Sequence, residues 1–185
     1  MTNIKNYTER YTSIAVPALK NMTGRTNTHA IPRVVKVVVN VGVGKAAHDQ
    51  KELDVVVRSI ERITGQKPVL TKARKSISSF KIREGMPIGV MVTLRGDRMR
   101  HFVEKLVHAA LPRVRDFRGI AGQSFGKSGV YTLGLKEHIV FPEIASDNVD
   151  SIHGVAVTIV TTARTPEEGK LLLTSLGFPF QETTK

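Results

Sequence analysis

The feature that most constrains the fold is a run of β-branched residues between Arg33 and Val41. Six of these nine residues are valine, and only Lys36 and Asn40 interrupt them. Branched side chains favour an extended backbone, so the run predicts a strand that ends at the glycines after Val41. Because the valines are nearly continuous, we expect both faces of this strand to be buried.

A helix is predicted before this strand, from Tyr7 to Met22. Ile14, Ala18 and Met22 recur at spacing four, which indicates an apolar stripe along one side of a helix. Pro17 lies inside the segment and requires a kink or a later start, because proline removes a backbone donor.

Two further helices each show a longer apolar stripe. Asp49 caps the first, which ends at Gly65, and Asp97 caps the second, which ends at Pro112. The inward-facing residues are Leu53, Val56, Val57, Ile60 and Ile63 in the first helix, and Met99, Phe102, Val103, Leu106, Val107 and Ala110 in the second.

The last helix has a complete start signal. Thr165 caps it, Pro166 takes the first position, and Glu168 completes a capping box. Gly177 ends it, and the residues expected to pack it down are Leu171, Leu172 and Leu176.

The remaining segments predict five more strands and one long loop. The strands cover 68–71, 80–83, 88–95, 130–135 and 155–162, and the glycine-rich loop 119–129 has a mobile character. This order of elements predicts an α+β fold: a mainly antiparallel sheet with helices packed on one face and the other face free to bind. We expect a single domain over residues 1–185, with a protruding basic loop near 72–87.

Positive charge is concentrated in the middle of the chain. The net charge is +12 and the pI is about 10.2, and residues 58–118 contain 15 Lys/Arg against 5 Asp/Glu. Residues 119–185 contain 5 against 7. Uneven charge of this kind favours a surface that binds a polyanion such as nucleic acid over a basic surface kept only for solubility.

The chain has the composition of a cytosolic protein. It contains no cysteine, so disulfides and cysteine-ligated zinc are excluded. The first residues lack the apolar core of a signal peptide, and the densest apolar run, 34–43, is too short to span a bilayer. We expect a cytoplasmic protein without a membrane partner.

Short motifs that hint at catalysis or metal binding lack the required context. Gly42-Val43-Gly44-Lys45 and Gly126-Lys127-Ser128 lack the glycine spacing of a phosphate-binding loop. Ser124 matches the Gly-x-Ser-x-Gly pattern of hydrolases without the parallel strands that such enzymes need. His101 and His108 share a helix face but are two turns apart, too far to hold one metal, and the other four histidines stand alone. We expect no enzyme, no cofactor and no metal; a nucleotide-binding enzyme is a distant alternative.

The segment 72–83 has the composition of an RNA-binding hairpin. It contains five cations and no acidic residue, and its tip consists largely of serines. Lysine and arginine neutralise phosphates, and hydroxyls bond phosphate and ribose oxygens. A solvated basic hairpin without a partner is the alternative.

The sequence motifs around this hairpin resemble those of a known protein family, and they extend over nearly the whole chain. They are Pro32-Arg33-Val34, Asn40-Val41-Gly42-Val43-Gly44, Gly65-Gln66-Lys67-Pro68, Thr71-Lys72-Ala73-Arg74-Lys75-Ser76, Phe80-Lys81-Ile82-Arg83, Pro87-Ile88-Gly89, Val92-Thr93-Leu94-Arg95-Gly96, Arg98-Met99, 112–119, Phe141-Pro142-Glu143-Ile144 and Gly177-Phe178-Pro179-Phe180. In order and spacing the chain closely resembles the bacterial family of large-ribosomal-subunit protein five, which binds 5S rRNA.

The resemblance implies a place in the central protuberance, where the family attaches 5S rRNA to the large-subunit rRNA. It implies 5S contacts by Asn40, Gln66 and Thr93, because these stand in the matching words. An amide that interrupts a valine-rich strand can both donate to and accept from sugar or base edges. The basic neighbours expected to join them are Arg33, Lys67 and Arg95.

The resemblance also implies contacts beyond 5S rRNA. The family's basic loop extends toward peptidyl-site tRNA, and the residues expected to contact tRNA or rRNA phosphates are Lys72, Arg74, Lys75, Ser76, Ser78, Lys81 and Arg83. The region after Arg113 is similar to the part that forms a bridge to a small-subunit ribosomal protein. Other 5S-associated ribosomal proteins are further expected partners, and the expected location is the ribosome in the cytoplasm.

Two departures from the family pattern lie near the expected bridge. Arg100 replaces a usual aromatic residue, and 125–129 replaces a polar, acidic-leaning loop. The alternative from another functional class is a general RNA chaperone that uses the same cations without a defined target.

Overall fold

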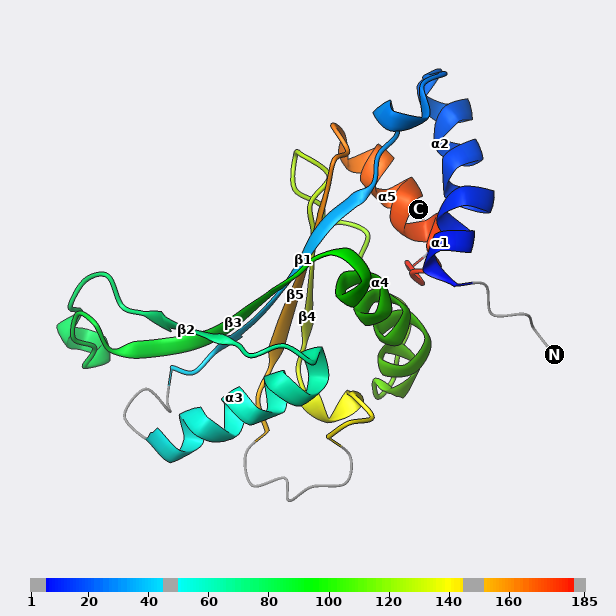
Figure 1. Cartoon of the computed structure of the whole chain (residues 1–185). Helices are drawn as coiled ribbons and strands as arrows, with labels where there is room; N and C mark the ends of the chain where they lie inside the picture. The colour runs from blue at the N-terminus through cyan, green and yellow to red at the C-terminus, as the bar shows by residue number, and fades with distance from the viewer. Residues whose placement is uncertain (1–5, 45–49, 145–151, 182–185) are drawn as a thin grey trace. The chain divides into compact units, whose positions relative to one another are not determined.

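The computed structural model of the chain describes residues 6–44, 50–144 and 152–181. It contains a five-stranded antiparallel sheet in the order β2-β3-β1-β5-β4 (Figure 1). The strands are β1 (Val34–Gly42), β2 (Val69–Lys72), β3 (Pro87–Leu94), β4 (Tyr131–Leu135) and β5 (Val155–Thr161). With the helices around this sheet, the predicted α+β class is confirmed, whereas the protrusion of the basic loop stays a prediction.

From Val37 onward β1 buries one face, so the expectation of burial on both faces is wrong there, whereas Val34 at its start is also buried. Val37, Val39 and Val41 are at most 1% exposed, whereas Asn40 between them is exposed. Successive side chains of a strand point to opposite faces, so the buried valines share one side. The alternate residues of β5 repeat this pattern. Asn40 therefore marks the open side.

The predicted strand 80–83 is also wrong. Ser78–Phe80 form a 3₁₀ turn, and Lys81 follows with a positive φ of 54°. The only strand-like pairing of this segment is an isolated bridge between Ile77 and Ile82. A left-handed residue reverses the chain, so the alternation seen in the sequence cannot continue as a strand.

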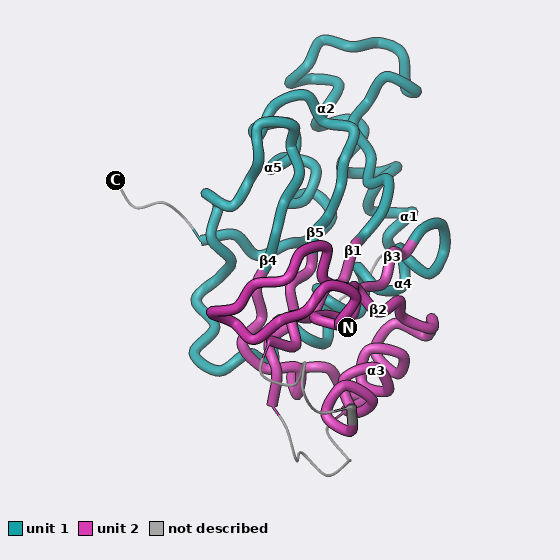
Figure 2. The backbone as a smooth tube through the Cα atoms, turned by 90° about the vertical axis from the view of Figure 1, so that its left-hand side faces the viewer, with its two compact units in different colours: residues 1–37, 95–133, 158–185 teal, residues 38–94, 134–157 magenta. Residues whose placement is uncertain are grey.

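The described residues cluster into two compact units (Figure 2). Unit 1 comprises 1–37, 95–133 and 158–185, and unit 2 comprises 38–94 and 134–157. Each unit is discontinuous in sequence, and β1 contributes residues to both. A single domain over 1–185 therefore stays a prediction.

In unit 1, the N-terminal helix contains a wide turn just before its proline. Its parts are α1 (Tyr7–Arg10), a π-helical turn (Tyr11–Ala15) and α2 (Val16–Thr23). The Val16 N–H bonds to Tyr11 O, five residues back. Pro17 has no N–H, and its ring would crowd the carbonyl four residues before it, so widening the preceding turn accommodates it.

The wide turn shifts the buried side of this helix. Ala15 and Leu19 are fully buried, whereas Ile14 and Met22 are 41% and 45% exposed. The predicted stripe of Ile14, Ala18 and Met22 is therefore wrong by one residue.

A second wide turn precedes Pro112. Helix α4 (Gly96–Lys105) continues into a π-helical turn (Leu106–Ala110), where Leu111 N–H bonds to Leu106 O. All six residues of the predicted inward face are buried, which confirms it. The predicted cap is wrong, because Arg95 occupies the N-cap and Asp97 lies in the first turn.

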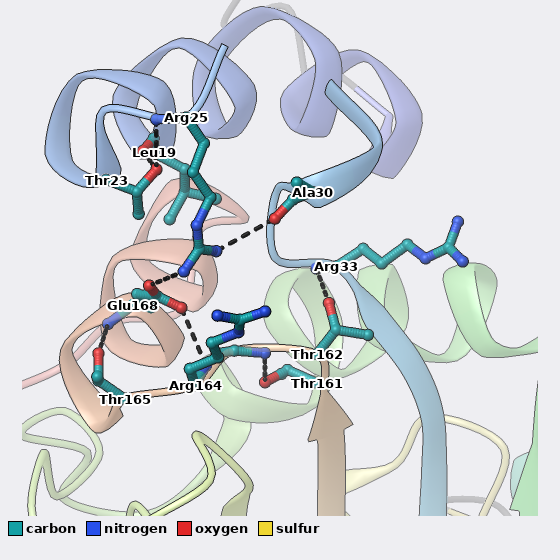
Figure 3. A network of polar contacts seen from close by, with 11 residues as sticks. Leu19, Thr23, Arg25, Ala30, Arg33, Thr161, Thr162, Arg164, Thr165 and Glu168 are labelled. Atoms are coloured by element: carbon teal, nitrogen blue, oxygen red, sulfur yellow. Dashed lines mark hydrogen bonds and ion pairs between the residues drawn. The ribbon is translucent and has the colours of Figure 1, made fainter. Parts of the chain in front are cut away.

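Helix α5 (Pro166–Ser175) begins as predicted, with one difference in its polar contacts (Figure 3). The Thr165 hydroxyl accepts from Glu168 N–H at 3.3 Å. The buried Glu168 carboxylate, however, accepts from Arg164 N–H at 2.9 Å and from the Arg25 guanidinium at 2.8 Å, instead of closing the capping box. Arg25 also donates to Ala30 O, so this ion pair attaches the chain after α2 to α5.

The leucines of α5 differ from the prediction at one position. Leu172 and Leu176 are buried as expected, but Leu173 is buried where Leu171 was expected. Gly177, with φ 99°, ends the helix as predicted.

In unit 2, helix α3 (Gln50–Thr64) contacts β3 (Figure 1). Its predicted stripe is buried except for the half-exposed Val57, and Gly65 ends it with φ 64°. The predicted cap, Asp49, lies outside the described residues. Burial of this stripe fixes the end of α3 next to the start of β2.

Two histidines that stand alone in the sequence stack in unit 2. The His138 and His153 ring centroids are 3.9 Å apart with an interplanar angle of 10°. His138 Nδ1 accepts from the His153 backbone N–H at 3.4 Å. Burial is the main cause that lowers the pKa of His138, while a backbone interaction with His153 acts in the opposite direction. The neutral ring is therefore the form that the fold favours.

This preference predicts a loss of stability in mild acid. The unfolded chain binds the proton first, near pH 6.5, so His138 stabilises the fold above that pH and destabilises it progressively below. Urea unfolding between pH 7.5 and 5.5 should show a falling free energy of unfolding. His138→Phe should flatten this dependence, whereas the exposed His101→Gln should keep it; equal slopes for all three proteins would contradict the assignment.

Candidate nucleic-acid interface

The open sheet face, which we define by Asn40, Val69, Met91 and Thr93, lies in unit 2. Val69 is paired with Met91 across the antiparallel β2–β3 ladder, so the two side chains share a face. Thr93 is two residues further along β3, and Val90, Val92 and Leu94 are buried on the other side. Asn40 is exposed, Val69 is 63% exposed, and Met91 and Thr93 are half-buried. The open sheet face thus combines apolar and neutral polar groups.

Gln66 is held at the edge of this face. Its Nε2 donates to Thr93 O at 3.3 Å, and its backbone O accepts from the Thr64 hydroxyl at 3.1 Å. The Thr64 hydroxyl thereby fixes the turn between α3 and β2. The structure therefore brings Gln66 and Thr93 together, and no hydrogen bond to another described residue engages the Gln66 amide oxygen.

On this face Gly89 of β3, which has no side chain, lies between β2 and β1. A Cβ added at Gly89 would lie 2.8 Å from Thr71 Oγ1 and 2.9 Å from Val41 O. Only glycine fits between a side chain and a carbonyl at such distances.

The predicted 5S-binding residues fall into both units. Asn40, Gln66, Lys67 and Thr93 belong to unit 2, with Lys67 exposed. Arg33 and Arg95 belong to unit 1 and are exposed as well. The backbone of Arg33 pairs with Thr162, at 3.0 Å and 2.9 Å, and its side chain extends away from the Glu168 network (Figure 3).

The β2–β3 loop, residues 73–86, has a defined backbone. Ala73 N–H bonds to Met86 O at 2.8 Å, and Ile77 and Ile82 exchange bonds of 2.9 Å and 3.1 Å. The Ser76 hydroxyl accepts from Glu84 N–H at 2.9 Å. These bonds close the loop on itself and direct its side chains outward.

All seven residues predicted to contact phosphates are exposed, one at the end of β2 and six in the loop: Lys72, Arg74, Lys75, Ser76, Ser78, Lys81 and Arg83. Within the part of the chain that the structure describes, none of the five cations forms an ion pair. No ion pair therefore offsets their mutual repulsion, and an external anion would relieve it.

The sequence reasoning missed an exposed aromatic ring in this loop. Phe80 is 69% exposed and Ile77 is 45% exposed. Phe80 lies between Ser79 and the left-handed Lys81, at the turn that replaces the predicted strand. An aromatic residue among cations and serines was the available signal, because such a ring offers a stacking surface for a base.

The glycine-rich loop 119–129 of unit 1 is attached by aromatic contacts. The Phe125 ring centroid lies 4.6 Å from that of Tyr131 and 5.7 Å from that of Phe180. The Tyr131 hydroxyl donates to Ala121 O at 3.0 Å. Phe125, in the segment expected to depart from the family pattern, thus packs inside unit 1.

The described residues were also compared with two other kinds of feature, a metal site and a membrane-spanning helix. No group of three or more His, Asp or Glu side chains is placed there to hold a metal ion. No helix in that part of the chain is long and apolar enough to cross a membrane.

The described features fit an RNA-binding protein. Exposed cations on a closed loop can neutralise phosphates, an exposed ring can stack on a base, and amide and hydroxyl groups can bond base and sugar edges. Their combination on one compact α+β scaffold is typical of proteins that recognise folded RNA.

Comparison with known proteins identifies the family. A model described as ribosomal protein L5 matches residues 27–83, and a second model, which describes the C-terminus of the same ribosomal protein family, matches residues 87–180. The chain belongs to the ribosomal protein L5 family. It is therefore a ribosomal protein and not an enzyme, and its partners are the ribosome and rRNA.

Individual relatives are similar over nearly their whole length. Each is named large ribosomal subunit protein uL5. The protein of Symbiobacterium thermophilum is 55% identical over 182 residues, which cover 98% of this chain and 99% of the relative. That of Brevibacillus brevis is 51% identical over 174 residues, 94% and 97% of the two chains. That of Synechococcus sp. strain RCC307 is 54% identical over 173 residues, again 94% and 97%. The predicted family and the ribosomal location in the cytoplasm are confirmed.

Gly89→Ala should destabilise the fold by about 1–3 kcal/mol, because the carbonyl of Val41 cannot rotate away from the added methyl group. Urea unfolding measures this. Gly134→Ala in β4, where no atom lies within 4 Å of the added Cβ, is the matched control and should be nearly neutral or slightly stabilising. Equal effects of the two substitutions would show that the close approach at Gly89 is unimportant.

Proposed function

We propose that this ribosomal protein is a structural constituent of the large subunit that binds 5S rRNA and attaches it to the large rRNA in the central protuberance. The observation that carries the proposal is the position of Gln66, hydrogen-bonded to Thr93 O at the edge of the open sheet face. Two residues that separate sequence motifs assign to 5S rRNA binding are thus in contact within one unit. The names of the relatives support the place in the large subunit.

The chemistry of the open sheet face fits a folded RNA. Side chains cannot enter the deep major groove of A-form RNA, so specific recognition uses shape and unpaired bases. Asn40 and the Gln66 amide can each donate and accept. Because the bond to Thr93 O already orders Gln66, binding costs less side-chain entropy.

Phe80 extends this interface to base stacking. Its ring is 69% exposed, and the turn that displays it also contains the cation Lys81. Stacking of a base on an aromatic ring contributes about 1–3 kcal/mol. In this proposal an unpaired base covers Phe80, which accounts for a large apolar group in a charged loop.

The β2–β3 loop contacts phosphates of peptidyl-site tRNA or of rRNA in the same proposal. Its four exposed cations, Lys72 at the end of β2, and the Ser76 and Ser78 hydroxyls form the contact. A bridge to a small-subunit ribosomal protein and contacts with other 5S-associated proteins complete the proposed set of partners. At the two departures from the family, Arg100 bonds to Asp97 at 3.1 Å and Phe125 packs inward, so neither side chain is committed to such a bridge.

Specificity separates this function from that of a general RNA chaperone. The chain should bind 5S rRNA more tightly than an unrelated RNA of equal length at the same salt concentration, and 5S rRNA should copurify with it. Equal affinities for both RNAs would favour the chaperone.

Asn40→Ala and Gln66→Ala should each weaken 5S binding by about 1–3 kcal/mol, since each leaves a polar partner unsatisfied in the complex. Affinities from filter binding measure this. Exposed residues of the same types in unit 1 supply controls, Asn21→Ala and Gln123→Ala, which should bind normally. Unchanged affinity for both test variants would withdraw the open sheet face as the 5S site.

Replacing Lys72, Arg74 and Lys75 with alanine should lower the log–log salt slope of tRNA binding by roughly 0.7–0.9 for each phosphate that the loop no longer neutralises. It should spare 5S binding if the loop serves tRNA. Alanine at the exposed Lys127, Lys136 and Lys170 removes the same charge elsewhere and should leave the slope unchanged. A slope that falls equally in both triple variants would indicate a general charge effect instead.

A further inference from the structure

Met86 closes the base of the β2–β3 loop with its backbone and also with its sulfur. Its N–H donates to Arg83 O at 3.2 Å, and its O accepts from Ala73 N–H at 2.8 Å. In addition, Met86 Sδ accepts from Arg83 N–H at 3.2 Å. Met86 and Arg83 therefore exchange two hydrogen bonds, and in one of them a thioether sulfur takes the place of an oxygen acceptor.

This contact distinguishes Met86 from other methionines. Met99 is buried, Met22 on α2 is 45% exposed, and Met91 is half-buried on the open sheet face. Among the residues that the structure describes, Met86 is the one methionine whose sulfur accepts a hydrogen bond. Met86 is half-buried and Arg83 is exposed, so the contact lies at the surface, within reach of a small solute.

A thioether at the surface can gain one oxygen atom from a peroxide. The sulfur gives an electron pair to one peroxide oxygen, an S–O bond forms as the O–O bond breaks, and water leaves when the peroxide is hydrogen peroxide. Methionine is thereby oxidised to its sulfoxide and the peroxide is reduced. The product is polar and chiral, whereas the thioether is apolar and a weak hydrogen-bond acceptor.

Either epimer of the sulfoxide disrupts the contact between Met86 and Arg83. An oxygen on the lone pair that faces Arg83 would stand between Sδ and the nitrogen. Their separation of 3.2 Å is too short for an S–O bond followed by a normal hydrogen bond of about 2.9 Å. An oxygen on the other lone pair leaves the sulfur with a partial positive charge, which repels the N–H. In both cases Arg83 N–H loses its present partner.

We propose that Met86 is a reversible oxidation site through which a peroxide loosens the base of the β2–β3 loop. Methionine sulfoxide reductases, one for each epimer, restore the thioether. The loosening reaches the charged surface of the loop directly, since Arg83 is one of its exposed cations. The inference goes beyond the proposed function, because neither the oxidation nor the loosening depends on what the loop binds.

Hydrogen peroxide, the full-length protein and amide exchange test this site. Treated protein should gain one oxygen at Met86, seen in peptide mass spectra. The Arg83 amide, followed by NMR, should exchange with deuterium about three- to tenfold faster, the effect of losing one hydrogen bond. The reductases should reverse both changes. Met86→Leu should exchange fast at Arg83 before treatment and should not respond to peroxide, whereas Met22→Leu and Met91→Leu, the matched controls, should respond as the wild type does.

Three results would overturn the inference. The first is an unoxidised Met86 at a peroxide concentration that oxidises Met22. The second is oxidation of Met86 with unchanged exchange at Arg83. The third is a peroxide response at Arg83 that persists in Met86→Leu, which would assign the effect to another residue. Failure of the proposed function would appear separately, as equal affinity of the untreated protein for 5S rRNA and unrelated RNA.

Discussion

The burial of one face of the sheet is the constraint on which the rest of the molecule depends. Alternate residues of β1, β3 and β5 are buried together, so the residues between them are available to other molecules. Asn40 and Thr93 are exposed or half-buried because their neighbours in sequence are buried. Packing of the core therefore determines which side chains form the open sheet face.

Local hydrogen bonds determine the chemistry that this scaffold displays. Gln66 is placed by Thr64 and by the backbone of β3, and the β2–β3 loop is closed by its own backbone pairs. Such contacts hold polar and charged groups in position before any partner arrives. A binding surface prepared in this way loses less entropy on association.

The periodic elements could be predicted from the sequence, and the exceptions have physical causes. The stripe of α4, most of the stripe of α3 and five of the strands follow from residue spacing and composition. The buried side of the N-terminal helix could not be predicted, because a wide turn before Pro17 shifts it by one residue. The alternation at 80–83 concealed a left-handed Lys81, and with it the exposed Phe80. The motifs shared with the family pointed to Asn40, Gln66 and Thr93. The hydrogen bond from Gln66 to Thr93 O could be found only in the structure.

The two wide turns couple a proline to the length of its helix. Each holds one residue more than an ordinary α-helical turn and ends two residues before a proline, which has no amide hydrogen. Changing Pro17 or Pro112 to another amino acid restores the missing donor but leaves the surplus residue in place. At Pro17, where α2 continues to Thr23, we expect a descendant that loses the proline to lose a neighbouring residue as well, because this keeps both ends of the helix in phase.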